Sequence, residues 1–364
     1  MVGTMSTGEA AYTSIQGIVP GYLLARLARS DRYERAARAA QQTLVAGRPV
    51  FHSTLELSIG ADGSLIAEVS AAPTRSIFDA QNTEKLPGVL VRSEDDEPVA
   101  DAAVNEAFDG LGATFQLLLD AFTRDSLDGA GAPLHATVHY GDRYDNAFWD
   151  GSRMVFGDGD GEVFTSFTRS VSVIGHELGH GVIQSSSGLV YQGQSGALNE
   201  SIADVLGVLT EQHLLDQTAD QASWLVGEGI FTEAVQGRAL RSMLEPGTAY
   251  DDDELGKDPQ PAHMRDYVQT DEDNGGVHIN SGIPNRAFAL AARAVGGHAW
   301  EGAGLAWYRA LTGGLEPTAG FSEFAEATLT AAADIGVTVE TAVREAWVAV
   351  GVIEDAREPE RDPR

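Results

Sequence analysis

The chain contains no cysteine among its 364 residues. This absence excludes disulfides, thiolate zinc sites and cysteine nucleophiles, so any metal must be held by histidine, aspartate or glutamate. No apolar run reaches about 18 residues, the length that a transmembrane helix requires, and we expect no membrane span. The first 30 residues have no apolar stretch between a basic start and a small-residue cleavage site, so no conventional secretory signal is visible.

Basic residues are scarce: 24 Lys and Arg stand against 54 Asp and Glu, which gives a formal net charge of −30. Such a chain would be repelled by nucleic-acid phosphates, so we expect no nucleic-acid partner. The first 50 residues differ, because they hold six arginines and only three acidic side chains. This basic start could be held electrostatically against the acidic remainder. A solvated basic helix is the alternative.

Three patterns organise the first part of the chain. Residues 20–46 are typical of a helix, with arginines spaced between apolar positions. Residues 50–70 alternate on both sides of a turn and predict a hairpin, and 71–76 are typical of a linker. Residues 77–170 mix strand-like stretches with one helical run around 98–122, whereas the chain from Ser170 onward is mainly helical.

The stretch SVIGHELGHGVIQ at 172–184 holds two histidines four residues apart, with a glutamate directly after the first. On a helix, residues at this spacing lie on one face, so His176 and His180 can both point at one zinc ion. A catalytic zinc site uses three protein ligands, and Glu177 can then take the proton of an attacking water. This short motif alone leaves a real site and a chance match equally open.

The following helical stretch, residues 196–209, offers the missing ligand. Glu200 and Asp204 lie one turn apart on a face that is separate from its apolar stripe. Glu200 can complete the zinc ligands, and Asp204 can hydrogen-bond the far nitrogen of a ligand histidine. The alternative is ordinary surface charge, although two carboxylates at this spacing repel each other when no cation is near.

Four ordered blocks resemble the thermolysin-like family of zinc endopeptidases. They are the zinc motif followed by Asn199, Glu200 and Asp204; NAFW at Asn146–Trp149; LRSM at Leu240–Met243; and DNGGVHINSGI at Asp273–Ile283. Over residues 75–352, the resemblance implies an α+β, two-lobed thermolysin-like fold. A β-rich N-terminal lobe and a mainly α-helical C-terminal lobe would hold zinc in the cleft between them.

The start of the chain extends the resemblance. IVPGYLLARLA at 18–28 resembles the short propeptide of the protealysin-like branch, although Gly21 stands where that branch usually has a second proline. The resemblance implies three parts: a prosegment at 1–72, made of a helix and a hairpin and removed on maturation, a β-rich lobe at 73–172, and a helical lobe at 173–364. The prosegment would inhibit its own enzyme. A permanent extra domain is the alternative.

The resemblance also implies catalytic roles. His176, His180 and Glu200 would hold zinc, while Glu177 moves the proton from water to the leaving amine. Tyr191 and His278 would donate to the oxygen on which charge develops. The remaining roles fall to Asp273, which would orient His278 and keep it protonated, and to Asn199 and Asp204, which would support the zinc histidines.

The same blocks imply which residues bind the substrate. Asn146 and the carbonyl of Ala147 would pair with an extended peptide, and Arg241 would bind a substrate carbonyl. A hydrophobic pocket would take the side chain after the cleaved bond, and its expected lining is Val173, Val226 and Leu240. Plain core packing is the alternative for these three side chains.

The chain departs from the family pattern at the calcium-binding positions. Many relatives carry a double calcium site, of which this chain keeps Glu211 and Glu228 but has Ser172, Ser223 and Leu225 where carboxylates are expected. Calcium needs about six to eight oxygen ligands, so we expect no double site and at most one weak calcium ion. Arg238 argues against a further calcium loop, and GDGDG at 157–161 favours a turn.

The sequence therefore predicts a monomeric zinc metalloendopeptidase made as a short-propeptide zymogen. It would cleave proteins and peptides on the N-terminal side of hydrophobic residues. We expect it to be secreted, with a cytoplasmic location as the alternative. A zinc aminopeptidase is a rival, but the chain lacks a Gly-Ala-Met-Glu-Asn-like motif for a free amine. A non-catalytic zinc-stabilised binding protein is another, but such a protein would not need Glu177 as a base.

Overall fold

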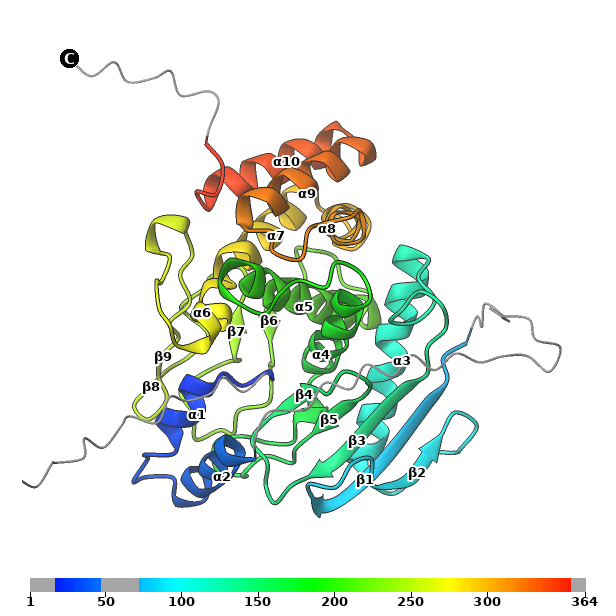
Figure 1. Ribbon diagram of the computed structural model, residues 1–364, viewed down its shortest axis with the longest axis vertical. Coiled ribbons are helices and arrows are strands. Elements are labelled where there is room, and N and C mark those ends of the chain that lie inside the picture. Colours follow the sequence, from blue (N-terminus) through cyan, green and yellow to red (C-terminus); the bar gives the residue numbers. More distant parts are fainter. Residues whose placement is uncertain (1–16, 47–71, 355–364) are drawn as a thin grey trace, which may run out of the picture.

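The computed structural model describes residues 17–46 and 72–354. A lobe built on a β-sheet lies below a lobe of helices, as Figure 1 shows. The first lobe and the segment before it contain these elements: α1 (Gly21–Leu27), α2 (Glu34–Val45), β1 (Arg75–Thr83), β2 (Val89–Ser93), α3 (Ala102–Phe122), β3 (Leu134–Tyr140), β4 (Ala147–Trp149), β5 (Met154–Phe156) and η1 (Phe167–Arg169).

The rest of the chain is mainly helical, as the sequence predicts. Its two-residue strands and short 3-10 helix lie in the long loops between α5 and α6. The elements are α4 (Val171–Gln184), α5 (Gly193–Leu214), β6 (Leu225–Val226), β7 (Arg241–Ser242), β8 (Asp251–Asp252), β9 (Gly256–Lys257), η2 (Met264–Asp266), α6 (Asp273–Asn280), α7 (Gly282–Val295), α8 (Ala303–Thr312), α9 (Phe321–Ile335) and α10 (Val337–Ala349).

The sheet of the lower lobe has five strands in the order β2-β1-β3-β5-β4. The pairs β1–β3 and β3–β5 are parallel, whereas β2 and β4 add to the two sides as antiparallel strands. Strand β4 is thus an edge, and it carries the residues of the NAFW block. An edge strand presents backbone groups with which an extended peptide can pair.

Helix α3 packs against this sheet and fixes the position of the zinc-motif helix. It begins after Asp101, whose carboxylate accepts the backbone amide of Ala103 at 2.9 Å. The guanidinium of Arg75 on β1 lies 3.7 Å from the centroid of the Phe108 ring. Gly110 leaves room for the side chain of Ile174, so α3 and α4 approach closely.

The helix predicted over residues 20–46 is wrong in one respect, because two helices form in its place. The chain leaves α1 at Leu27 and enters α2 at Glu34. Between them the Ser30 hydroxyl accepts the backbone amides of Arg32 and Tyr33 at 3.2 and 3.1 Å. Serine competes for backbone groups in this way and favours a turn over a continuous helix.

Three further stretches are assigned from the sequence: 50–70, 71–76 and 153–164. The hairpin predicted at 50–70 lies outside the described residues. The linker predicted at 71–76 is too long by two residues, because β1 already begins at Arg75, whose backbone amide donates to Glu94 at 2.9 Å. Only Met154–Phe156 of the strand-like run at 153–164 form a strand, β5. In the turn that follows, the Asp160 carboxylate accepts the backbone amide of Val163 instead.

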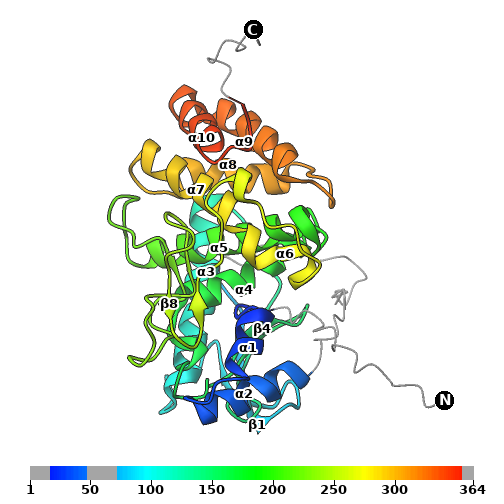
Figure 2. The ribbon, with the colours of Figure 1, turned by 90° about the vertical axis from the view of Figure 1, so that its left-hand side faces the viewer.

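The helical lobe has an aromatic core. Trp307 of α8 and Trp347 of α10 stack with ring centroids 5.6 Å apart, and the Trp347 indole donates to Thr328 of α9 at 2.8 Å. Figure 2 shows these helices at the end of the molecule opposite α1 and α2. No helix in the described part of the chain is long and apolar enough to cross a membrane.

Candidate metal centre and cleft

Helices α4 and α5 meet through small residues, and this contact assembles the site. A Cβ atom added at Gly179 would lie 2.9 Å from the Ala203 backbone, and one at Gly175 would lie 2.7 Å from the Thr210 hydroxyl. Larger side chains at these positions would push the helices apart. The close approach brings His176 and His180 of α4 to Glu200 of α5.

These three side chains are buried, and one ligand atom from each lies within 4.8 Å of the others. The two imidazole Nε2 atoms are 3.2 Å apart, and oxygens of Glu200 lie 3.5 and 3.6 Å from them. Burial lowers the pKa of His180 to about 4, which favours the neutral imidazole that binds metal. Burial opposes ionisation of Glu200, but the nearby histidines and Arg241 lower its pKa.

The set fits zinc. Two imidazoles and a carboxylate are a frequent catalytic zinc ligand set. Glu200 Oε2 accepts no hydrogen bond from any described residue although it is buried. A buried carboxylate oxygen without a donor is costly unless a cation binds it. The ligand set and this unpaired oxygen together indicate a metal centre.

Groups behind the histidines fix their orientation. His176 Nδ1 lies 2.7 Å from Asp204, and His180 Nδ1 lies 2.8 Å from Asn199, so each Nε2 faces the shared centre. Burial raises the pKa of Asp204, but Arg241 and His176 lower it by more, so Asp204 stays ionised. The sequence predicts supporting contacts to the histidines for both Asp204 and Asn199.

Glu177 lies beside the metal centre with its carboxyl group fully buried. Its Oε2 accepts the backbone amide of Trp149 at 3.0 Å, whereas Oε1 has no hydrogen-bond partner among the described residues. Burial, and then the charge of Glu200, raise its pKa well above the ordinary glutamate value. A carboxyl group beside a metal centre can serve in proton transfer.

A sharp turn brings Asp273 back onto His278. Residues 273–276 all have φ between +51° and +82°, a left-handed run that two glycines ease. Asp273 accepts the backbone amide of His278 at 2.9 Å and lies 2.6 Å from its Nδ1. Burial lowers the pKa of His278, but Asp273 and Glu200 raise it to about 9, so the imidazole is protonated at neutral pH.

Tyr191 completes this side of the centre. Its hydroxyl donates to Glu200 and lies 3.3 Å from His278 Nε2. Burial and the charge of Glu200 raise its pKa, so it remains a neutral donor. Two polar donors thus converge beside the ligand set.

The three residues predicted to bind substrate all hydrogen-bond one segment, residues 18 and 19. Ala147 O accepts the amide of Ile18 at 3.1 Å, and Arg241 donates to Ile18 O at 3.1 Å. Asn146 accepts the Val19 amide at 2.9 Å and donates to Val19 O at 3.1 Å. Arg241 is held in place by two hydrogen bonds to Asp204, of 2.7 and 2.9 Å.

Comparison with known proteins agrees with this geometry. The model described as the catalytic domain of thermolysin metallopeptidases matches residues 53–184, and the model of their alpha-helical domain matches residues 187–352. The chain belongs to the thermolysin family of metallopeptidases. The family uses zinc, so the ligand set of this metallopeptidase is a zinc site.

Relatives match this chain over half to all of their own length. An extracellular metalloprotease of Pectobacterium carotovorum subsp. carotovorum is 46% identical over 93% of this chain and 96% of its own. The solved precursor of protealysin from Serratia proteamaculans matches with a TM-score of 0.84 and 48% identity, over 93% of this chain and 100% of its own. A thermolysin of Alicyclobacillus acidocaldarius is 40% identical, and the match covers 76% of this chain and 50% of that protein.

Two buried side-chain amides of this metallopeptidase are not predicted from its sequence. Asn285 of α7 donates to Asp204 Oδ2 at 2.8 Å, on the side opposite His176. Gln260 donates to the backbone carbonyl of His278 at 2.8 Å and so fastens the turn that carries it. No motif singles out these residues, because they come from distant parts of the chain and contact the site only after folding.

The expected calcium positions show a different chemistry. The Ser172 hydroxyl accepts the amide of Gly227 at 3.1 Å, and it also hydrogen-bonds Glu211, whose pKa burial raises. At 157–161 the carboxylate of Asp160 accepts backbone amides of Glu162 and Val163 at 2.5 and 2.7 Å. The GDGDG run of this metallopeptidase is therefore a turn closed by its own aspartate, as the sequence indicates.

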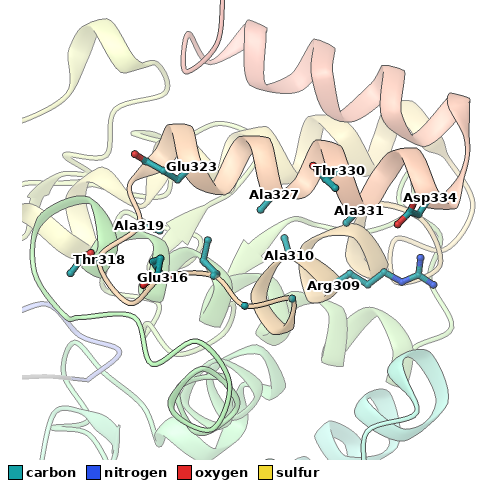
Figure 3. A pocket seen from close by; sticks show the side chains of 13 residues that line it. Arg309, Ala310, Glu316, Thr318, Ala319, Glu323, Ala327, Thr330, Ala331 and Asp334 are labelled. Atoms are coloured by element: carbon teal, nitrogen blue, oxygen red, sulfur yellow. The ribbon is translucent and has the colours of Figure 1, made fainter.

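A pocket of about 610 Å³ lies elsewhere, against α8, α9 and the loop between them. Figure 3 shows Glu316, Thr318 and Glu323 at one end and Arg309 with Asp334 at the other. None of the residues predicted to bind zinc or substrate lines it. This hollow of the metallopeptidase is therefore separate from the metal centre.

Proposed function

We propose that this zinc metallopeptidase hydrolyses peptide bonds with Glu177 as its base and acid, at a zinc ion held by His176, His180 and Glu200. The observation that carries the proposal is the buried carboxyl of Glu177 beside a buried ligand set. When it is bound, the chemistry that zinc supplies is polarisation of a carbonyl and activation of water. Glu177 removes a proton from the attacking water and delivers it to the nitrogen of the leaving amine.

The other polar groups act on the substrate carbonyl and backbone. His278 and Tyr191 donate hydrogen bonds to the carbonyl oxygen as negative charge develops on it. Asp273 holds His278 protonated for this task. Asn146 and the carbonyl of Ala147 align the peptide along β4, and Arg241 binds the carbonyl of the residue after the cleaved bond.

A hydrophobic side chain after the cleaved bond suits this cleft. Ile18 is fully buried where it meets Ala147 and Arg241. We assign the lining of the pocket to Val173, Val226 and Leu240, which are buried in the same hydrophobic cluster. Burying such a side chain contributes about 1.5–3 kcal/mol, which explains a preference for cleavage on its N-terminal side.

Residues 1–72 act in this proposal as an inhibitory prosegment. Residues 17–19 occupy the hydrogen-bonding groups that a substrate needs, so the two compete. Helix α2 anchors the segment, because Glu162 accepts the amides of Arg35 and Ala36 at 2.9 and 3.2 Å. The Tyr33 hydroxyl adds a hydrogen bond to Ala234 O at 3.1 Å. Release of the prosegment would open the cleft.

The remaining proposals concern organisation. We assign 73–172 to the β-rich lobe and 173–364 to the helical lobe, and α4 begins at Val171, two residues before residue 173. The enzyme acts as a secreted monomer, in keeping with its extracellular relatives. A double calcium site is not part of the proposal, and at most one weak calcium ion would bind near Glu211 and Glu228.

A peptide series tests the proposal. The protein is trimmed briefly with trypsin, stripped of metal with a chelator, and given back zinc. Peptides with leucine, alanine or aspartate at one position are then offered, and the cleaved bond is identified by mass. We expect zinc to restore cleavage before leucine. Equal cleavage by the metal-free protein, or cleavage before aspartate only, would contradict the proposal.

A further inference from the structure

The segment before α1 contacts the groups that are predicted to bind and polarise a substrate. The oxygen of Gly17 is 3.2 Å from Nε2 of His278, whose Nδ1 lies 2.6 Å from Asp273. The next residue, Ile18, is fully buried and is held at both its amide and its carbonyl. The contacts therefore point to one particular peptide bond, the one between Gly17 and Ile18.

The nitrogen of that bond lies near Glu177, the proposed acid and base. The Ile18 amide donates to Ala147 O at 3.1 Å and lies beside the Glu177 carboxyl. A leaving amine must receive its proton at this nitrogen. The carbonyl oxygen thus lies next to His278 and the nitrogen lies near Glu177, as hydrolysis of this bond requires.

We propose that this metallopeptidase cleaves its own chain between Gly17 and Ile18. The inference rests on the proposed function, whose catalytic groups it uses. The oxygen of water forms a bond to the Gly17 carbonyl carbon, and the bond from that carbon to the Ile18 nitrogen breaks. Glu177 carries one proton from water to this nitrogen. A carboxyl group on Gly17 and an amino group on Ile18 result.

Cleavage here would not open the cleft. The new chain start at Ile18 stays attached to α1 and α2, which Glu162 and Ala234 hold through Arg35 and Tyr33. Val19 also keeps both of its hydrogen bonds to Asn146. We therefore expect a nicked protein that lacks Met1–Gly17 and remains closed to other substrates until the rest of the prosegment leaves.

Glycine is required on the carbonyl side of the bond. A Cβ atom at position 17 would lie 2.6 Å from Ala147 O and 3.0 Å from the amide group of Asn146. Neither group can give way easily, since Ala147 is buried in β4 and Asn146 is buried beside it. Gly17→Ala should displace the bond by about 1 Å. Misplacement of this order slows a reaction by roughly 10²-fold.

The test uses full-length protein kept metal-free until zinc is added. Intact mass and N-terminal sequencing follow the parent, Glu177→Gln, Gly17→Ala and the control Val45→Asp, whose side chain is 83% exposed on α2. We expect the parent and the control to lose Met1–Gly17 at a rate that does not depend on protein concentration. Glu177→Gln should stay intact, and Gly17→Ala should be slower by roughly 10²-fold.

Hydrogen exchange on the metal-free proteins gives a readout that needs no catalysis. We expect the amides of Ile18 and Val19 to exchange slowly in the parent and in Glu177→Gln, because both are buried and hydrogen-bonded. Gly17→Ala should speed their exchange. Fast exchange in the parent would overturn the register on which the inference rests.

Activity on an added peptide, measured after trypsin trimming, separates the two claims. Peptide cleavage with the Gly17–Ile18 bond intact would refute self-cleavage and leave the proposed function standing. If neither the added peptide nor the Gly17–Ile18 bond is cleaved, both the proposed function and self-cleavage are refuted. Loss of Met1–Gly17 at a rate that rises with concentration, or at an equal rate in Gly17→Ala, would refute cleavage within the docked chain.

Discussion

At the scale of single residues, Asp204 is the junction of the site. Its carboxylate contacts His176, Arg241 and Asn285. A buried carboxylate of this kind must keep all its partners, because each lost donor leaves an oxygen unpaired. In the proposed function, metal binding and substrate binding would therefore be coupled through Asp204.

Asn285→Ala tests this junction. Removing the 2.8 Å hydrogen bond to Asp204 should loosen His176 and weaken zinc binding by roughly 10-fold, the lower end for such supporting contacts. Competition with a chromogenic chelator measures the change. The control is Asn105→Ala, which loses hydrogen bonds to Arg92 and Val99 far from the zinc. Equal zinc affinity in the parent and in Asn285→Ala would contradict the coupling.

His139 makes stability depend on pH. Its ring nitrogens lie 2.8 Å from Asp158 and 2.8 Å from Asp101, and hydrogen bonds to Asp158 first, then Asp101, raise its pKa to about 9 against burial. Because the folded pKa is raised, the stabilisation is complete below the unfolded pKa near 6.5 and is lost as pH rises through 9.

The free energy of unfolding should therefore fall from pH 6.5 to pH 9 more steeply in the parent than in His139→Gln. Urea denaturation at a series of pH values measures the difference between the two proteins. A difference that stays constant over this range would show that His139 carries no extra proton in the folded state.

At the scale of elements, the contact between α4 and α5 decides whether a zinc site exists. Gly179→Ala places a Cβ atom 2.9 Å from the Ala203 backbone, and such overpacking costs about 1–3 kcal/mol. We expect a lower melting temperature and weaker zinc binding, because Glu200 moves away from both histidines.

Gly21→Ala is the matched control for this substitution. It adds a methyl group to helix α1, where no atom lies within 4 Å. It should leave zinc affinity unchanged. If Gly179→Ala bound zinc as tightly as this control, close helix packing would not be what sets the ligand geometry.

At the scale of the whole molecule, the sequence predicts the two lobes and most of the site. His176 and His180 follow from helical spacing, and Glu200 follows because a neighbouring helix must supply a third ligand. Local patterns cannot predict contacts between distant segments. They miss Asn285, the break that Ser30 makes between α1 and α2, and the register in which Gly17 meets His278, since these depend on packing across the fold.

The central claim is that the buried metal centre is catalytic and that Glu177 is its base. The most direct measurement compares the parent with Glu177→Gln, both trimmed and loaded with zinc. Zinc content is determined by mass spectrometry, and peptide hydrolysis is determined alongside it. We predict equal zinc content and a fall in hydrolysis of at least roughly 10²–10⁴-fold. Hydrolysis at the parent rate with zinc bound would contradict the account.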